Sequence, residues 1–286
     1  MEFKPHEREE NVMKAAQMYK VEGYGAIVTG GASGIGLAFT EVLAENGARV
    51  TMLDIHDERL DTETKRLKAK GWEVRGMKVD VADHAALDRA FDETTRLYGR
   101  LDVAFANAGI DPGVGFVTVD RAKRVPEGAI ENYTDERWNR VIDINLNAVF
   151  ATIRAAARHM KPQGSGRIIV TTSMAGLYVE AGIGAAYMAA KAGAAHLARN
   201  AALELAKHNI LVNAIAPGWV ITNIGGGWMN DKKVQDEVGQ WVPLRHVAST
   251  EELKGLALFL ASPASSYITG AQIPVDGGFL LGNVAN

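Results

Sequence analysis

The chain has 286 residues, with 47% hydrophobic and 23% charged side chains, which suits one large α/β globular domain or two small ones. Its formal net charge of −3, from 31 basic and 34 acidic side chains, gives no electrostatic footprint for nucleic acid or an anionic membrane. The absence of cysteine excludes disulfides, zinc–thiolate sites and a cysteine nucleophile.

Residues 1–23 are rich in charge and precede the first predicted strand, so we expect a polar N-terminal extension, either a surface helix or a mobile arm, to which no function is attached. The start of the chain has no apolar signal core. The long apolar stretch 183–206 is interrupted by charges such as Lys191 and Arg199, so it does not predict a membrane span. Cytoplasmic residence is the default expectation, with residues 24–286 as one domain.

Short β-rich runs alternate with longer helical patterns through the rest of the chain. Strands are predicted at 25–30, 48–55, 73–81, 101–109, 166–173, 210–218 and 271–278. Helices are predicted near 34–46, 57–70, 83–98, 134–160, 185–207 and 250–261. Most of the strands carry unbroken apolar stretches, as in a parallel sheet that is covered on both faces. The alternation predicts an α/β fold with one doubly wound parallel sheet of about seven strands and helices on both faces.

The run VTGGASGIG joins the first predicted strand to the first helix. Gly30, Gly34 and Gly36 allow a tight backbone turn and let a diphosphate approach the N-terminus of the helix. The spacing differs from the general dinucleotide fingerprint G-x-G-x-x-G, so a simple glycine-rich turn is the plainer reading. The position after the first strand, and Asp54 at the end of the second, favour dinucleotide binding.

Asp54 lies 18 residues beyond Gly36, close to the spacing at which an acid accepts hydrogen bonds from an adenosine ribose. Its charge would repel a 2′-phosphate, and neither residues 31–36 nor position 55 offers a compensating Arg or Lys. NAD is therefore favoured over NADP. Alone, Asp54 would be an ordinary acid at a strand end.

Two long irregular segments follow Gly109 and Thr222, and the second contains three consecutive glycines. Such segments are usually functional or disordered. In an open α/β sheet both would lie beyond the carboxyl ends of strands, where such sheets bind ligands. We hypothesise that residues 223–245 form a lid with Gly225–Gly227 as its hinge.

The run YMAAK places Tyr187 and Lys191 four residues apart, as neighbours on one helix face. An unperturbed tyrosine has a pKa of about 10, and a neighbouring ammonium favours the phenolate and lowers that pKa. Ser173, at the end of a predicted strand, could donate a hydrogen bond to a substrate oxygen. Each of these residues alone would be unremarked in a core or on a surface, so their combination carries the prediction.

The glycine run, NAG at 107–109, Asn145, Ser173, YMAAK, and PGWVIT at 217–222 occur in an order that resembles the short-chain dehydrogenase/reductases, in their NAD(P)-dependent form with a Y-x-x-x-K centre. The resemblance runs from about residue 24 to about residue 280. It implies a single Rossmann-like domain, often assembled as a homotetramer. The segment after Gly109 is longer than is usual in that family, and the N-terminal arm is extra.

The same resemblance implies roles for individual residues. Tyr187 would be the catalytic acid/base, and Lys191 would hold the nicotinamide ribose and lower the tyrosine pKa. Ser173 would bind the substrate oxygen, and Asn145 would bend its helix and hold a water in a proton relay. The residues implied to contact the cofactor are Gly30, Ser33, Gly34, Ile35, Gly36, Asp54, Ile55, Asp80, Val81, Asn107, Ala108, Gly109, Tyr187, Lys191, Pro217, Gly218, Val220 and Thr222.

The sequence thus predicts an NAD-dependent oxidoreductase that moves a hydride between the nicotinamide and a secondary alcohol or ketone. A pocket wall of Met174, Tyr178, Trp219, Trp228, Met229 and the loop after Gly109 favours an apolar or aromatic substrate. The scattered histidines show no ligand spacing, so no metal is expected. A dinucleotide-binding regulator without turnover, or an epimerase or dehydratase on the same scaffold, stays open as an alternative.

Overall fold

A seven-stranded parallel sheet forms the centre of the chain in this computed structural model, which describes residues 14–111, 113–118 and 122–282. The strands are β1 (Gly25–Thr29), β2 (Arg49–Asp54), β3 (Val74–Lys78), β4 (Val103–Ala106), β5 (Gly166–Thr171), β6 (Ile210–Pro217) and β7 (Gln272–Val275). Their order is β3-β2-β1-β4-β5-β6-β7, and every neighbouring pair is parallel. The strand order reverses direction between β1 and β4, which is where an open sheet of this kind leaves a ligand crevice.

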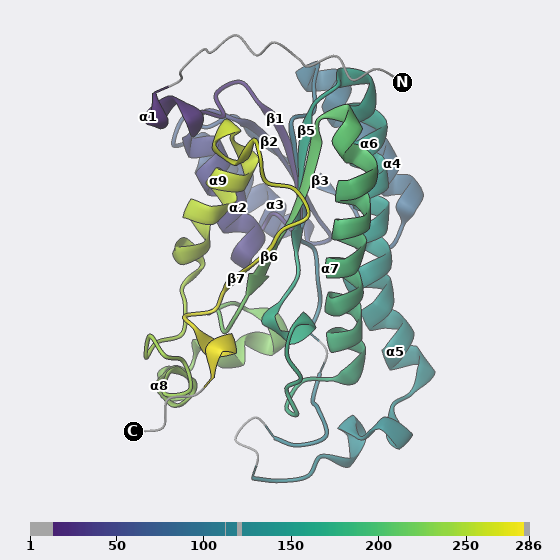
Figure 1. Cartoon of the computed structure of the whole chain (residues 1–286), viewed down its shortest axis with the longest axis vertical. Helices are drawn as coiled ribbons and strands as arrows, with labels where there is room; N and C mark the ends of the chain where they lie inside the picture. Colours follow the sequence, from purple (N-terminus) through teal and green to yellow (C-terminus); the bar gives the residue numbers. More distant parts are fainter. Residues whose placement is uncertain (1–13, 112, 119–121, 283–286) are drawn as a thin grey trace, which may run out of the picture.

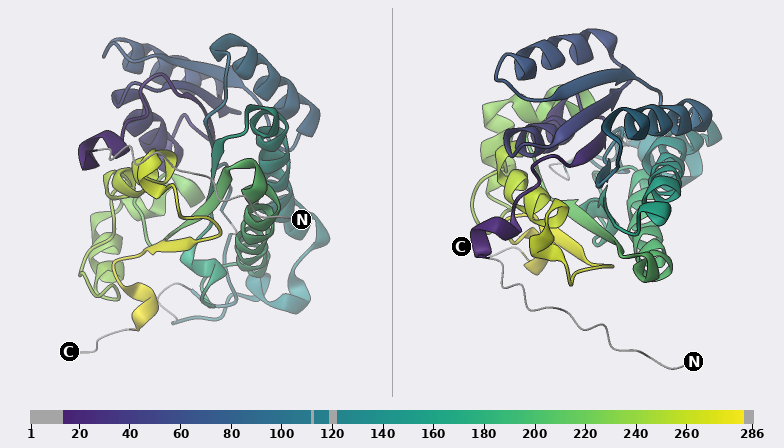
Figure 2. Two further views of the ribbon diagram at one scale, coloured as in Figure 1. Left: turned by 45° about the horizontal axis from the view of Figure 1, so that its top comes forward. Right: turned by 90° about the horizontal axis from the view of Figure 1, so that it is seen from above.

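Helices cover both faces of this sheet. They are α1 (Ala15–Met18), α2 (Gly34–Glu45), α3 (Asp57–Lys68), α4 (His84–Tyr98), α5 (Asp135–Ile142), α6 (Ala148–Gln163), α7 (Ala185–Leu205), α8 (Lys232–Gly239) and α9 (Lys254–Ala261). The long helices α4, α6 and α7 stand on one side of the sheet, and α2, α3 and α9 stand on the other (Figures 1 and 2). The predicted doubly wound fold is confirmed.

The unbroken apolar strands are explained by burial on both faces. In β1, Ile27 belongs to the core under α4, α6 and α7, while its neighbours Ala26 and Val28 belong to the core under α2 and α9. This alternation follows from the two-residue period of a strand. In the second core, the rings of Phe39 and Phe105 lie 4.7 Å apart.

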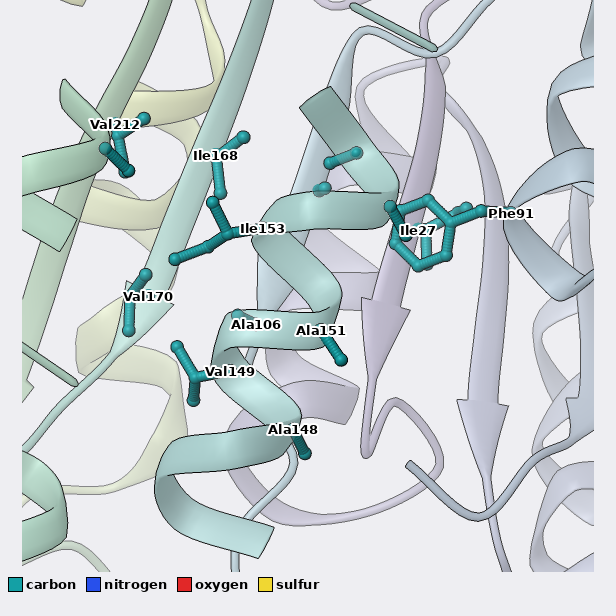
Figure 3. Packing of buried hydrophobic residues seen from close by; sticks show 14 of the residues in the cluster. Ile27, Phe91, Ala106, Ala148, Val149, Ala151, Ile153, Ile168, Val170 and Val212 are labelled. Atoms are coloured by element: carbon teal, nitrogen blue, oxygen red, sulfur yellow. The ribbon is translucent and has the colours of Figure 1, made fainter. Parts of the chain in front are cut away.

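The first core is seen from close by in Figure 3, where Val149 and Ile153 of α6 point toward β5. There they meet Val170 and Ile168, all within one buried cluster. Because both faces are held in this way, the carboxyl ends of the central strands keep fixed positions for the site described below.

A single turn of π-helix, Asp143–Asn147, separates α5 from α6, where the sequence predicts one continuous helix. The amide of Asn145 donates to the carbonyls of Val141 and Ile110, both at 3.2 Å. Turns of this kind are rare and are found most often at functional sites. The wider turn brings a polar side chain from the helix to the end of β4.

The segment after Thr222 is more regular than predicted. It contains a 3₁₀ turn, Ile224–Asn230, and then α8, which Asp231 caps by accepting the backbone N–H of Lys233 at 2.8 Å. Gly225–Gly227 have φ values of +64°, +80° and +76°, a left-handed run that only glycine adopts without strain. Because these glycines interrupt the helical pattern, the sequence does not predict α8, which follows them.

Part of what the sequence predicts lies outside the described residues. This holds for residues 1–13 of the N-terminal extension and for 112 and 119–121 of the segment after Gly109. The described part of that segment forms two 3₁₀ turns, Pro126–Gly128 and Ile130–Asn132. No helix in the described ranges has both the length and the apolar character needed to cross a membrane.

Candidate active site

A cavity of about 1330 Å³ opens at the carboxyl ends of the central strands. Every residue predicted to react or to contact the cofactor lines it, from the β1–α2 turn at one end to α7 and the turn after β6 at the other. The fold therefore brings together residues that are spread over nearly two hundred positions of the sequence, from Gly30 to Thr222.

The glycine turn forms a cradle at the N-terminus of α2. Gly30 and Gly34 have φ values of +64° and +51°. A Cβ on Gly36 would lie 2.1 Å from the carbonyl oxygen of Gly30 and 2.5 Å from Nδ2 of Asn107, so no side chain fits there. The first N–H groups of a helix have no intrahelical partners and attract anions. The cradle therefore fits the diphosphate of a dinucleotide.

Asp54 ends β2 beside this cradle and is 7% exposed. Its carboxylate accepts the backbone N–H groups of Ala32 and His56, at 3.3 Å and 3.1 Å. Two backbone donors hold the carboxylate at the cavity wall, where an adenosine ribose would meet it. Arg59 of α3 also lines the cavity. This cation lies outside positions 31–36 and 55, where the sequence has no Arg or Lys.

Tyr187, Lys191 and Ser173 meet where α7 crosses the end of β5. Nζ of Lys191, which is 3% exposed, donates to the carbonyl of Thr171 at 2.9 Å and lies 5.4 Å from the ring centre of Tyr187. The hydroxyl of Ser173 lies near enough to that of Tyr187 to act on the phenol pKa, and Ser173 Oγ accepts the N–H of Ala175 at 3.1 Å. The phenol, the ammonium and the second hydroxyl thus converge as the sequence predicts.

Burial dominates the electrostatics of this group. Burial raises the pKa of Tyr187 to about 12, against the effect of the Ser173 hydroxyl, and the negative charge of Asp111 adds to the rise. Burial also lowers the pKa of Lys191 to about 8. Desolvation of the phenol therefore outweighs the other influences on its pKa, and the lowering expected from Lys191 stays a prediction.

The buried ammonium predicts a pH-dependent stability. An unfolded chain holds the Lys191 proton up to a pKa near 10.5, whereas the folded chain releases it near 8. Between these values the unfolded state binds more protons, so stability rises with pH. From about pH 7 to about pH 9.5, the parent protein should gain roughly 2 kcal/mol relative to Lys191→Met. Urea unfolding of both proteins measures this difference, and a gap that stays constant with pH would contradict the burial of the charge.

Asn145 adds a buried acceptor at the end of β4. It is fully buried, and its Oδ1 has no hydrogen-bond partner among the described residues. A Cβ on Gly109 would lie 2.8 Å from this oxygen and 3.6 Å from Nζ of Lys191. Glycine at this position therefore lets the amide and the ammonium approach the same strand end. An unpartnered buried acceptor suits a residue that holds a water.

The substrate half of the cavity matches the predicted wall in part. Met174, Trp219, Trp228 and Met229 line the cavity. Tyr178 is not among the lining residues of the described chain; its ring packs edge-on against Phe279 instead, with centroids 5.6 Å apart.

The lining residues that were not predicted individually include Ile110, Asp111, Val114 and Ile183. The first three follow Gly109 directly, in the long segment that the sequence marks as functional. The bridge between Val114 and Ile183 is a non-local pairing that no local pattern announces.

Known proteins resemble this chain over nearly its whole length. A family model described as enoyl-(acyl carrier protein) reductase matches residues 30–280. The 3-oxoacyl-(acyl-carrier-protein) reductase of Thermotoga maritima is 33% identical over 92% of this chain and 100% of its own. A short-chain type dehydrogenase/reductase from Mycobacterium marinum superposes with a TM-score of 0.82 at 32% identity, covering 93% of this chain and 99% of the other. A gluconate 5-dehydrogenase from Burkholderia cenocepacia, solved with NADP and tartrate, gives 0.82 at 30% identity over 94% and 99%.

Proposed function

The chain belongs to the short-chain dehydrogenase/reductase family, and from this premise we propose that it is an NAD-dependent oxidoreductase acting on a secondary alcohol or ketone. The single observation that carries the proposal is the convergence of Ser173, Tyr187 and Lys191 in the cavity whose other end holds the glycine cradle. A cradle alone would suit a regulator that only binds the cofactor. The buried phenol beside an ammonium favours an enzyme.

The nicotinamide, when bound, supplies hydride transfer, and the protein supplies position and proton transfer. Gly30, Gly34 and Gly36 would receive the diphosphate, and Asp54 the adenosine ribose. Lys191 would hold the nicotinamide ribose. The supporting observations are the lack of side chains over the N-terminus of α2 and the fixed carboxylate of Asp54.

Tyr187 is the acid/base of the proposed reaction. With its pKa raised to about 12, the phenol is protonated near neutrality and is ready to donate to a carbonyl oxygen in reduction. In oxidation it accepts the alcohol proton, which requires nearby positive charge; the ammonium of Lys191 stands 5.4 Å from the ring. Ser173 stabilises the substrate oxygen as charge develops on it. Asn145 would hold a water that passes the proton onward.

An apolar or aromatic carbon frame is the substrate class that the wall supports best, since Met174, Trp219, Trp228 and Met229 line it. Residues 223–245 would close over that frame as a lid, with Gly225–Gly227 as the hinge. A homotetramer and a cytoplasmic location stay predictions from the sequence.

The preference for NAD gives a second prediction. A 2′-phosphate would have to approach the carboxylate of Asp54, so the parent enzyme should use NAD better than NADP although one relative was solved with NADP. Asp54→Asn should reduce the ratio of kcat/KM for NAD over NADP at least about tenfold, because it removes a full negative charge at short range. Initial rates with both cofactors measure the ratio.

Asp57→Asn is the matched control, since this acid lies exposed on α3, pairs with Lys78 at 3.3 Å and does not line the cavity. Its NAD to NADP ratio should stay within about twofold of the parent value. A parent enzyme that prefers NADP would overturn the assignment and would favour Arg59 as the residue that binds the 2′-phosphate.

The reaction itself is tested by an absorbance screen for NADH formation across aliphatic, aromatic, steroid and sugar alcohols, repeated with NADP. At least one secondary alcohol should give steady net NADH. Binding of NADH without any net absorbance change across the screen would favour the regulator or an epimerase, which returns its hydride to the substrate.

A further inference from the structure

A carboxylate that the proposed reaction does not use lies in the substrate half of the cavity. Asp111 is half-buried and follows Gly109 by two residues, at the end of β4. Its Oδ1 accepts the backbone N–H of Gly113 at 2.9 Å. Among the described residues it forms no ion pair. The same charge reaches Tyr187, where it raises the phenol pKa.

This carboxylate and an aromatic side chain both lie close to Gly225. A Cβ on Gly225 would lie 1.9 Å from Oδ2 of Asp111 and 3.2 Å from Cδ1 of Trp228. The carboxylate and the indole therefore flank one glycine of the 3₁₀ turn, and both line the cavity. Trp228 is braced edge-on by Trp219, with ring centroids 6.0 Å apart and planes at 84°.

This combination has a specific chemical meaning. Indole rings attract cations through their π-electron faces, and a carboxylate beside them adds a full negative charge. An alkylated ammonium carries its charge on an apolar surface, so it suits a site that is aromatic and acidic at once. The same carboxylate would repel an anionic ligand, and it would also disfavour a purely apolar ligand.

The remaining charges of the substrate half agree. Glu136, Arg140 and Asp143 line its rim and are exposed. Among the described lining residues of this half, Asp111, Glu136 and Asp143 are acidic and Arg140 is basic. The charge balance disfavours a carboxylate substrate at this end of the cavity.

We propose that the substrate is an amino alcohol or amino ketone whose alkylated, positively charged nitrogen lies in the cavity against Asp111 and Trp228 while its oxygen lies at Tyr187 and Ser173. The position given to the substrate oxygen rests on the proposed oxidoreductase function, whereas the position given to the nitrogen does not. Asp111 is then the residue that determines specificity for charge. The carbon frame between nitrogen and oxygen meets the apolar wall.

The test uses a pair of alcohols that differ only in charge: 4-hydroxy-1,1-dimethylpiperidinium, which is permanently cationic, and its carbon analogue 4,4-dimethylcyclohexanol. Isothermal titration of each into the protein with saturating NADH measures binding without reaction. The parent should bind the cation at least about tenfold more tightly than the carbon analogue, given the size of a cation–π contact joined to a charge pair. In Asp111→Asn, which keeps an acceptor for Gly113, the preference should fall to about twofold or less.

Asp92→Asn supplies the control, because this exposed acid of α4 makes the same change of charge and lies next to His159, at 3.0 Å, away from the cavity. It should keep the parent preference. Equal affinities in the parent, or a cation preference that survives in Asp111→Asn, would overturn the inference. Oxidation of the two alcohols with NAD is scored separately: a cation that binds selectively but is never oxidised contradicts the proposed function and leaves the cation site standing.

Discussion

Tyr187→Phe should lower turnover at least about a hundredfold, because proton transfer by a positioned side chain typically contributes about 10²–10⁴-fold. The ring keeps its packing on α7, so folding and NADH binding should stay close to those of the parent. Steady-state rates on the best alcohol of the screen give the first quantity. Fluorescence titration with NADH gives the second.

Tyr267→Phe is the control for this change, since the side chain of Tyr267 is 95% exposed and its hydroxyl is remote from the cavity. It should leave turnover unaltered. If the phenylalanine at 187 were as active as the parent on any alcohol that is oxidised, the acid/base would have to be another group, and the mechanism proposed for Tyr187 would be wrong.

Gly36→Ala should remove most of the affinity for the dinucleotide and lower the free energy of unfolding by about 1–3 kcal/mol, as expected when a close-packed site is overfilled. The added Cβ would stand 2.1 Å from the backbone oxygen of Gly30, and backbone cannot rotate away as a flexible side chain can. The turn must open, which moves the N–H groups that are to meet the diphosphate. Urea unfolding and NADH titration measure the two effects.

Gly255→Ala separates this clash from the general effect of adding a methyl group. Gly255 lies in α9, and a Cβ there meets nothing within 4 Å. Alanine should stabilise the helix by about 0.5–1 kcal/mol and leave NADH affinity unchanged. A Gly36→Ala protein that binds NADH as well as Gly255→Ala does would show that the cradle is not the diphosphate site.

The sequence predicted the sheet well because both faces of its central strands are buried. Runs such as residues 166–173 are apolar without alternation, and glycine or proline marks where several of them end, so strand and helix could be told apart. The segment after Thr222 was harder. Three left-handed glycines break any helical pattern, and only the tertiary structure reveals that Asp231 caps a helix directly after them.

The site was predictable where its chemistry lies in the chain order of motifs, and less so where it depends on burial. Tyr187 and Lys191 could be paired from their spacing, but their pKa values could not, because desolvation depends on what the whole fold places around them. Tyr178 is an aromatic residue of the kind expected in the pocket wall, but its ring packs against Phe279. The sequence could not place the charge of Asp111 in the pocket, since Asp111 and Gly225 lie close together although they are more than a hundred residues apart in the chain.

The central claim is that this chain moves a hydride while Tyr187 moves a proton. Deuterium placed on the carbinol carbon of the best alcohol tests it most directly. In the parent protein the label should appear on the nicotinamide ring of the isolated NADH, with a net rise in NADH absorbance, and both should vanish in Tyr187→Phe. Bound NADH that stays unlabelled, with the deuterium retained in the alcohol or lost to water, would contradict it.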